Sequence, residues 1–243
     1  MGRVAIHCEP RIKWQGDFAL KMQKGLRRIG IDSFITTCRS RETDIAILLG
    51  TTCWRSVEAF GKYLLVDRAS YGDPYYVQLV WDGHGRRGNH CVPKKRGNRW
   101  ESIGLEVLPW ATSGHRVLLC GQTETYSPYF LDVKDWYKTV RATHFRCHPA
   151  GDNPTNLPCM KDWADVGRVV TLNSSIGVES VLTGIPTVTM DEGAMAWDVS
   201  SHSASKSITP DRRRWLHWLA WTQWNHDEIE AGKPIKHLFE DAL

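Results

Sequence analysis

An α/β fold is predicted, with two Rossmann-like halves that each hold a parallel sheet and a C-terminal helical region that crosses back. Short apolar runs alternate with amphipathic stretches along most of the 243 residues, as strands and helices of a parallel sheet do. The alternation is interrupted over residues 68–110 and resumes at His115. A hydrophobic fraction of 42% supplies enough apolar surface for a core.

The first half is expected to begin with a strand over Arg3–Cys8, followed by a helix over Gly16–Gly30. Apolar residues recur every three or four positions in this helix, Asp17 is a candidate N-cap, and Gly30 ends it. Further strands are expected at 32–38, 44–50 and 62–67, with a short helix at 51–61. Residues 68–110 are rich in Gly, Pro, aromatic and basic residues, which is typical of a functional loop region.

The second half is expected to contain strands at 115–122, 143–149, 167–173 and 185–190. Helices are expected at 132–142, 156–167 and 174–184, and a terminal helical region at 212–232. Four tryptophans in this last region recur in steps of three and are expected to pack in the core or between domains: Trp215, Trp218, Trp221 and Trp224. The predicted domains are 1–112, 113–205 and 206–243.

Composition excludes several classes of protein. The net charge is only +4, and no apolar run reaches the ~18 residues that a membrane helix needs. The first residues carry charges inside their apolar run, unlike a secretory signal. The seven cysteines are odd in number and lack Cys-x-x-Cys spacing, so we expect reduced, buried thiols and neither a zinc site nor a disulfide framework. A cytoplasmic protein without stable membrane association is therefore expected.

Small and polar side chains follow three of the predicted strands in the second half. Ligands of open α/β sheets bind beyond the carboxyl ends of the strands. Gly121 and Gln122 follow the first of these strands, and His148 and Pro149 follow the second. A glycine lets a ligand approach the backbone, and a histidine there can donate to a phosphate. A purely structural loop histidine is the alternative.

The third of these segments is Asn173-Ser174-Ser175, which ends a predicted strand and opens a helix. Free N–H groups at a helix start suit a phosphate, although the same pattern also makes an ordinary N-cap. Glu179 lies on the first turns of this helix, where it could bond a ribose hydroxyl or remain solvated.

The order of these segments resembles the donor half of GT-B glycosyltransferases. Gly-Gln, His-Pro and Asn-Ser-Ser-x-Gly-x-Glu-x-x-x-x-Gly-x-Pro follow one another as in the capsule-type Kdo and sialyl transferases, over Val117–Trp197. The resemblance implies that His148, Ser174 and Ser175 hold the phosphates of a nucleotide sugar, with a UDP-sugar favoured, and that Glu179 lies near the nucleotide. It also implies a transfer without a metal ion. The chain is short for two full GT-B halves, so its first half must be trimmed.

Such a transfer needs a base that takes the proton of the acceptor hydroxyl. The candidates in the first half are Asp17, Asp67 and Asp82, with Asp73 and His84 as further possibilities. The sequence does not rank them, and Asp17 has its own explanation as an N-cap. Glycines around His84 (Gly83, Gly85 and Gly88) are expected to keep this loop open to a bulky acceptor.

The acceptor is predicted from a basic stretch without acidic residues. It runs from His84 to Arg99 and contains Arg86, Arg87, Lys94, Lys95, Arg96 and Arg99. Basic residues interleaved with aromatics suit a DNA backbone and a flipped base, whereas a solvated loop is the plain alternative. Bacteriophages glycosylate hydroxymethylated pyrimidines of their DNA with compact GT-B enzymes. The favoured prediction is therefore a phage-type DNA glycosyltransferase acting on double-stranded DNA in the bacterial host cytoplasm.

Three alternatives stay open. A surface-polysaccharide glycosyltransferase of the Kdo or sialyl type would use the basic stretch to bind an acidic glycan or a membrane surface. A nucleotide- or DNA-binding module would need no base at all. An epimerase-like enzyme of the same fold would consume the nucleotide sugar without an acceptor.

Overall fold

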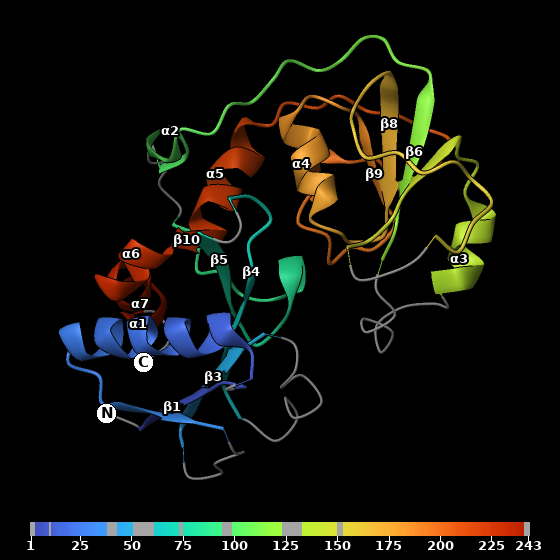
Figure 1. The fold of residues 1–243 in the computed structure, drawn as a ribbon. Coiled ribbons are helices and arrows are strands. Elements are labelled where there is room, and N and C mark those ends of the chain that lie inside the picture. The colour runs from blue at the N-terminus through green and yellow to red at the C-terminus, as the bar shows by residue number, and fades with distance from the viewer. Residues whose placement is uncertain are drawn as a thin grey trace. The chain divides into compact units, whose positions relative to one another are not determined.

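Two compact units make up the chain in a computed structural model (Figure 1). The structure describes residues 3–9, 11–37, 43–50, 61–72, 75–93, 99–122, 133–149 and 153–240. Unit 1 comprises residues 1–100 and 217–243, and unit 2 comprises residues 101–216. The α/β class with parallel sheets is confirmed. The division differs from the expected domains, because it falls at residue 100 and the C-terminal residues belong to unit 1.

Unit 1 is built on a six-stranded sheet with the order β10-β5-β4-β3-β1-β2. Four of its strands are parallel and match the predicted ones: β1 (Val4–His7), β2 (Ser33–Thr36), β3 (Ile45–Leu49) and β4 (Tyr63–Arg68). The other two were not predicted: β5 (Tyr76–Trp81), antiparallel to β4, and β10 (Gln223–Asn225), antiparallel to β5. The stretch expected to be a loop thus supplies an interior strand, and the C-terminus supplies an edge strand.

Three helices pack together on unit 1, as Figure 1 shows: α1 (Lys13–Arg28), α6 (His226–Glu230) and α7 (Lys233–Glu240). Phe18, Met22 and Leu26 recur along α1 and are fully buried against the sheet and the C-terminal helices. A Cβ on Gly25 would overlap the carbonyl oxygen of Ile229, so this glycine permits the close contact of α1 with α6.

Two expectations in unit 1 are wrong. Helix α1 begins at Lys13 with Ile12 at the N-cap, so Asp17 is not a cap. Asp17 lies one turn into the helix and is exposed.

The C-terminal helix is shorter than expected. Helix α5 (Arg213–Thr222) ends where β10 begins, because residues 223–225 pair with β5. Trp224 therefore lies in a strand. It is buried, as is Trp215, which confirms the packing role expected for both. The helix expected at 51–61 lies largely outside the described residues.

Unit 2 holds a fully parallel sheet with the order β7-β6-β8-β9. Its strands are β6 (Arg116–Cys120), β7 (His144–Arg146), β8 (Val166–Thr171) and β9 (Thr187–Thr189). Helices α3 (Val133–Thr139) and α4 (Ile176–Leu182) cover opposite faces of this sheet and seal two apolar clusters (Figure 1). Short helical segments complete the described chain: η2 (Gly85–Arg87), α2 (Arg99–Ile103) and η4 (Trp197–Val199).

The helix predicted at 156–167 is wrong. The segment instead runs beside β7: the Phe145 N–H donates to the Pro158 carbonyl at 3.0 Å, and the Met160 N–H donates to the Phe145 carbonyl at 2.8 Å. Asn153 accepts from both the N–H and the hydroxyl of Thr155, which favours a turn before the segment.

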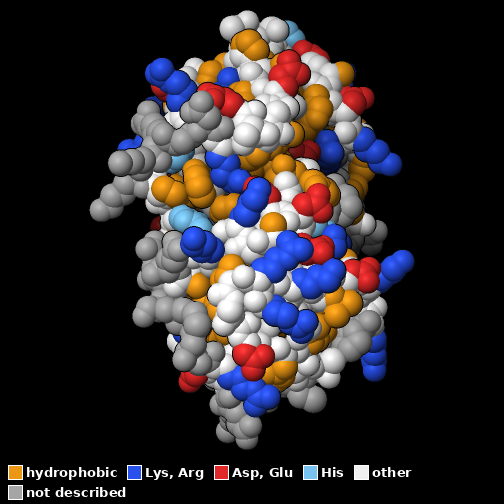
Figure 2. Space-filling model, turned by 90° about the vertical axis from the view of Figure 1, so that its left-hand side faces the viewer, with side chains coloured by type: hydrophobic (Ala, Val, Ile, Leu, Met, Phe, Trp, Pro, Cys, Tyr) orange, Lys and Arg blue, Asp and Glu red, His pale blue; other side chains and the backbone are white. Residues whose placement is uncertain are grey.

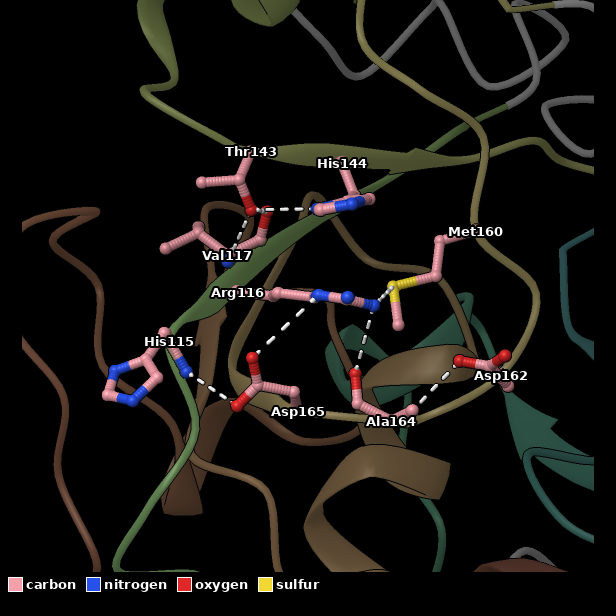
Figure 3. Close-up of polar contacts among 9 residues, drawn as sticks. All are labelled: His115, Arg116, Val117, Thr143, His144, Met160, Asp162, Ala164 and Asp165. Atoms are coloured by element: carbon pink, nitrogen blue, oxygen red, sulfur yellow. Dashed lines mark hydrogen bonds and ion pairs between the residues drawn. The ribbon is translucent and has the colours of Figure 1, made fainter.

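The amino-terminal edge of the unit 2 sheet is held by a set of polar contacts (Figure 3). Asp165 has a left-handed backbone with φ +58, and its carboxylate accepts from the His115 N–H at 3.2 Å and lies 3.8 Å from the Arg116 guanidinium. The Thr143 hydroxyl accepts from the Val117 N–H at 3.0 Å, and Asp162 caps the Ala164 N–H at 3.1 Å. Asp165 thus ties the start of β6 to the turn that precedes β8, Thr143 ties it to the start of β7, and Asp162 holds the turn itself.

Within the described ranges, no helix is both long and apolar enough to cross a membrane. The same residues contain no group of three or more His, Cys, Asp or Glu side chains that could hold a metal ion.

Candidate active site

The carboxyl ends of the four unit 2 strands are aligned. Cys120 lies beside Arg146 in the register, Leu119 beside Val170, and Thr171 beside Thr189. The residues that follow the strands therefore emerge at one edge of the sheet, which is where open α/β sheets bind ligands. The segments beginning at Gly121, Cys147 and Leu172 lie along this edge.

Gly121 and His148 come together where β6 and β7 end. The Gly121 N–H donates to the Arg146 carbonyl at 2.9 Å. A Cβ built on Gly121 would lie 3.0 Å from the backbone nitrogen of His148 and 3.1 Å from the Phe145 ring. Gly121 thus allows two strand ends to meet closely, and a larger residue there would displace His148. His148 is half-buried, and Pro149 after it is exposed.

Gln122 is held through its backbone by Tyr137 of α3. Its N–H donates to the Tyr137 hydroxyl at 2.7 Å, and that hydroxyl donates to the Gln122 carbonyl at 3.2 Å. The side-chain oxygen of Gln122 is buried, and no donor from the described part of the chain reaches it. An acceptor in this situation is available to a donor group of a ligand.

Ser174 and Ser175 differ in how their hydroxyls are used. The Ser174 hydroxyl accepts weakly from the Ile176 N–H at 3.4 Å, and the Ser174 N–H donates to the Thr171 hydroxyl at 3.3 Å. Ser175 is the N-cap residue of α4, but its exposed hydroxyl makes no capping bond. The ordinary N-cap explanation thus accounts poorly for Ser175, whose hydroxyl faces solvent at the start of the helix.

Asn173 is used to position a buried carboxylate. Its side-chain amide donates to Asp191 at 3.1 Å, and the Asp191 N–H donates to the Leu172 carbonyl at 3.3 Å. Asp191 is only 6% exposed. Asp191 follows β9 without any motif around it, so no sequence pattern marks it as a site residue. The contact fastens the end of β9 to the end of β8.

Arg146 adds a positive charge that the sequence analysis also missed. Its guanidinium donates to the Lys161 carbonyl at 2.8 Å and lies over the Trp163 ring. Burial raises the pKa of the Glu179 carboxyl, and the charge of Arg146 partly offsets this shift. Burial also raises the pKa of the Cys120 thiol to about 12, with Arg146 and Glu179 acting in opposite directions. Arg146 and Glu179 therefore lie close enough to the end of β6 to influence the same thiol. Arg146 is the last residue of β7, and its position near the end of a predicted strand, two residues before His148, is the signal that could have found it.

In unit 1, two of the candidate bases lie together. The His84 Nε2 is 3.0 Å from a carboxylate oxygen of Asp67, and these side chains are 23% and 19% exposed. The other Asp67 oxygen accepts from the Arg68 N–H at 2.8 Å. A histidine oriented by a carboxylate is the arrangement of a general base. Sequence reasoning considered the two residues separately, since 17 positions part them.

Asp82 has a structural role instead. It has a left-handed backbone with φ +49, and its carboxylate accepts from the Tyr63 N–H at 2.9 Å at the start of β4. Asp67 lies near the other end of the same strand, so the three expected acids (Asp17, Asp67 and Asp82) are not brought together. Asp73 is outside the described residues.

The loop that carries His84 is closely packed, contrary to the open loop expected from its glycines. A Cβ on Gly83 would lie 2.5 Å from the Cα of Gly88, and a Cβ on Gly88 would overlap the Val80 side chain. His90 is buried beneath the loop, within hydrogen-bond distance of the Leu79 and Gly85 carbonyls, and burial lowers its pKa to about 4. These glycines serve close backbone packing, which holds His84 in place.

The basic stretch divides into three parts. Arg86 and Arg87 lie in η2. Arg86 is half-buried and Arg87 is exposed, whereas Lys94, Lys95 and Arg96 are outside the described residues.

Arg99 forms a bidentate ion pair with Glu228 and donates to the carbonyls of Ala220 and Gln223. With a side chain only 12% exposed, Arg99 serves unit 1 internally and offers little surface to a duplex. On the face shown in Figure 2, Lys and Arg side chains are interspersed with Asp and Glu.

Comparison with known proteins identifies the fold. No protein-family model matches the chain, and no curated protein matches it by sequence. Among solved structures, the KpsC β-Kdo 2,7 transferase of Thermosulfurimonas dismutans is similar, with a TM-score of 0.55 and 13% identity over 97% of this chain and 100% of that chain. The KpsC β-Kdo 2,4 transferase of the same organism gives a TM-score of 0.52 and 10% identity over 90% and 89%. The chain therefore has the α/β fold of these Kdo transferases over nearly its full length.

Proposed function

We propose that this protein is a glycosyltransferase that moves a sugar from a nucleotide sugar to an acceptor hydroxyl. One observation carries the proposal: Gly121, His148 and the Ser174–Ser175 pair follow neighbouring parallel strands whose carboxyl ends are aligned. The fold in which they lie is that of two Kdo transferases.

The donor is expected to bind at this edge of unit 2. Strand β6 lies between β7 and β8, and neighbouring strands are about 4.8 Å apart, so a phosphate over Gly121 would be within side-chain reach of both flanking segments. His148 would donate to the phosphate from one side, and the hydroxyls of Ser174 and Ser175 from the other. A UDP-sugar is the favoured donor. No metal ion is required in this scheme, which predicts activity that survives chelation.

The proton acceptor is proposed to be the Asp67–His84 pair of unit 1. Nε2 of His84 contacts the carboxylate, so Asp67 orients the ring and stabilises the imidazolium that forms when the acceptor hydroxyl loses its proton. Replacing His84 with Ala should lower kcat by about a hundred- to ten-thousand-fold. Asp17→Asn is the comparison variant, because Asp17 is exposed on α1. Loss of activity in Asp17→Asn with an active His84→Ala would move the base to Asp17.

The favoured acceptor is a hydroxymethylated pyrimidine in double-stranded DNA. The proposal rests on the basic stretch that contains Arg86, Arg87, Lys94, Lys95 and Arg96, and places the enzyme in the cytoplasm of a phage-infected bacterium. A second candidate is an acidic surface glycan, which the same basic stretch would bind in a surface-polysaccharide glycosyltransferase of the Kdo or sialyl type.

A transfer assay tests both the glycosyltransferase activity and the choice of acceptor. Purified protein would be incubated with nucleotide sugars and either duplex DNA carrying 5-hydroxymethylcytosine or 5-hydroxymethyluracil, or Kdo-containing oligosaccharides. Mass spectrometry would then detect added sugar, with unmodified DNA as the matched control and a chelator in parallel. Transfer to modified DNA supports the favoured acceptor, and transfer to the glycan alone supports the second. Nucleotide-sugar breakdown or isomerisation without any acceptor product would contradict the transferase itself.

A further inference from the structure

Two thiols lie against each other beside the proposed phosphate site. The sulfur atoms of Cys147 and Cys159 are 3.4 Å apart. Cys147 directly precedes His148, and Cys159 pairs with Phe145 of β7 through the backbone. The composition predicts reduced, buried thiols. Cys8 and Cys120 are buried as expected, but Cys147 is half-buried and Cys159 is exposed.

The surroundings of Cys159 favour reaction at its sulfur. The Asn153 side-chain amide donates to the Cys159 sulfur at 3.3 Å and to the Leu157 carbonyl at 2.9 Å. The amide contact holds the Cys159 sulfur in place, and its exposure gives a small oxidant access to it. The neighbouring segment is anchored independently, because Phe145 bonds both Pro158 and Met160.

We propose that Cys147 and Cys159 form a redox-active pair whose disulfide displaces His148 and thereby weakens nucleotide binding. The effect on nucleotide rests on the proposed function, whereas formation of the disulfide does not. A disulfide needs a sulfur–sulfur distance of about 2.05 Å, so the two sulfur atoms must approach by more than an ångström, through rotation of both side chains and a shift of the segments that carry them. Because His148 follows Cys147 directly and its backbone lies close to Gly121, a shift of the Cys147 backbone displaces His148.

The oxidant we name is a low-molecular-weight disulfide such as oxidised glutathione. The Cys159 thiolate attacks one of its sulfurs, forms a mixed disulfide and releases one thiolate. The Cys147 thiolate then attacks the Cys159 sulfur and releases the second. The two protons lost by the cysteines are taken up by the released thiolates. The protein loses two hydrogens in total, and one small disulfide becomes two thiols.

The first part of the test detects the disulfide between Cys147 and Cys159. The full chain would be equilibrated in glutathione buffers of increasing oxidised fraction, trapped with an alkylating reagent, and analysed by peptide mapping. We expect a linked peptide that joins Cys147 to Cys159, and its absence in Cys147→Ser and Cys159→Ser. Cys91→Ser is the matched control, since this partly exposed cysteine lies in unit 1. Glutathione attached to Cys159 without a linked peptide would overturn the proposal.

The second arm measures UDP affinity by calorimetry before and after oxidation. We expect oxidation to weaken binding by about tenfold in the natural protein and in Cys91→Ser, to be reversed by dithiothreitol, and to have no effect in Cys147→Ser. Formation of the linked peptide with unchanged affinity would overturn the coupling to His148. If the reduced protein binds no nucleotide at all, the proposed function fails, while the linked peptide still decides whether the pair is redox-active.

Discussion

The two edges of the unit 2 sheet differ in how fully the fold uses their polar groups. At the amino-terminal edge, Asp165, Asp162 and Thr143 each accept a backbone N–H, so their side chains hold turns in place (Figure 3). At the carboxyl edge, the Ser175 hydroxyl makes no capping bond, and no described residue donates to the buried side-chain oxygen of Gln122. Groups that the fold does not use are available to a ligand, which is why we place the donor at the carboxyl edge.

A glycine from each edge gives the largest expected contrast. A Cβ on Gly167 would overlap the carbonyl oxygen of Gly114, so Gly167→Ala forces two backbones apart. We expect a loss of about 2–3 kcal/mol in the free energy of unfolding, measured with denaturant, and unchanged nucleotide affinity in the protein that remains folded. Gly121→Ala, whose Cβ would lie 3.0 Å from the His148 nitrogen, should instead weaken nucleotide binding more than it affects folding. If both variants mainly lower the free energy of unfolding, or both mainly weaken nucleotide binding, the contrast between the two edges is contradicted.

The serine pair tests the carboxyl edge alone. Replacing Ser174 and Ser175 with Ala should weaken nucleotide binding by about 1–3 kcal/mol, because hydrogen bonds to a charged phosphate are lost. Stability should change little, since Ser175 makes no capping bond and the Ser174 bond is 3.4 Å long. Calorimetric titration with UDP, alongside thermal unfolding, measures both. An unchanged affinity would remove the phosphate assignment.

Asp165 gives the equivalent test at the amino-terminal edge. Asp165→Ala removes one of the two acceptors of the His115 N–H, which also donates to the Asp165 carbonyl at 3.1 Å, and places alanine at a φ of +58, so we expect a loss of about 1–2 kcal/mol in stability. Asp165→Asn is the matched control, because asparagine tolerates this backbone and keeps an acceptor oxygen. Neither variant should change nucleotide affinity. Weaker nucleotide binding in Asp165→Ala would mean that the two edges are not independent.

Glu179 gives the smallest expected effect, and it depends on pH. Glu179 is an exposed residue, but partial burial of its carboxyl raises the pKa above the ordinary 4.5 in the folded protein, so ionising it costs a little folding energy. Stability contributed by the protonated group is present below pH 4.5 and is lost as the pH rises through the raised pKa. Glu179→Gln should therefore be slightly more stable than the natural protein at pH 7, by well under 1 kcal/mol, and equal to it at low pH. Thermal unfolding across this range would show the opposite trend if Arg146 outweighed burial.

Local patterns predicted most of the fold. The strands β1, β3, β4, β6 and β8 each contain a short run of mostly apolar buried residues, which is the pattern that predicts strands of a parallel sheet. Strand β10 was missed because Gln223-Trp224-Asn225 continues a tryptophan-rich helical pattern, and only its pairing with β5 makes it a strand. The helix predicted at 156–167 is wrong for the same reason. Backbone hydrogen bonds from this segment to Phe145, which is distant in sequence, hold it extended beside β7.

The site was predicted in part for a related reason. Small and polar residues after strands mark the carboxyl edge in the sequence, so Gly121, His148 and the two serines could be placed together. Pairings between distant residues leave no such pattern: His84 with Asp67, and Asn173 with Asp191, follow only from the fold. Arg99 was assigned to DNA from its neighbours in sequence, whereas its partner Glu228 lies in the C-terminal part of unit 1.

Hydrogen exchange with and without UDP, followed by mass spectrometry on the full chain, tests the central claim most directly. If the carboxyl edge holds the donor phosphates, saturating UDP should slow amide exchange in residues 146–148 and 173–179. Residues 114–117 and 162–167 at the opposite edge should exchange as before. Slowed exchange at the amino-terminal edge, or unchanged exchange at the carboxyl edge when calorimetry reports saturation, would contradict the account.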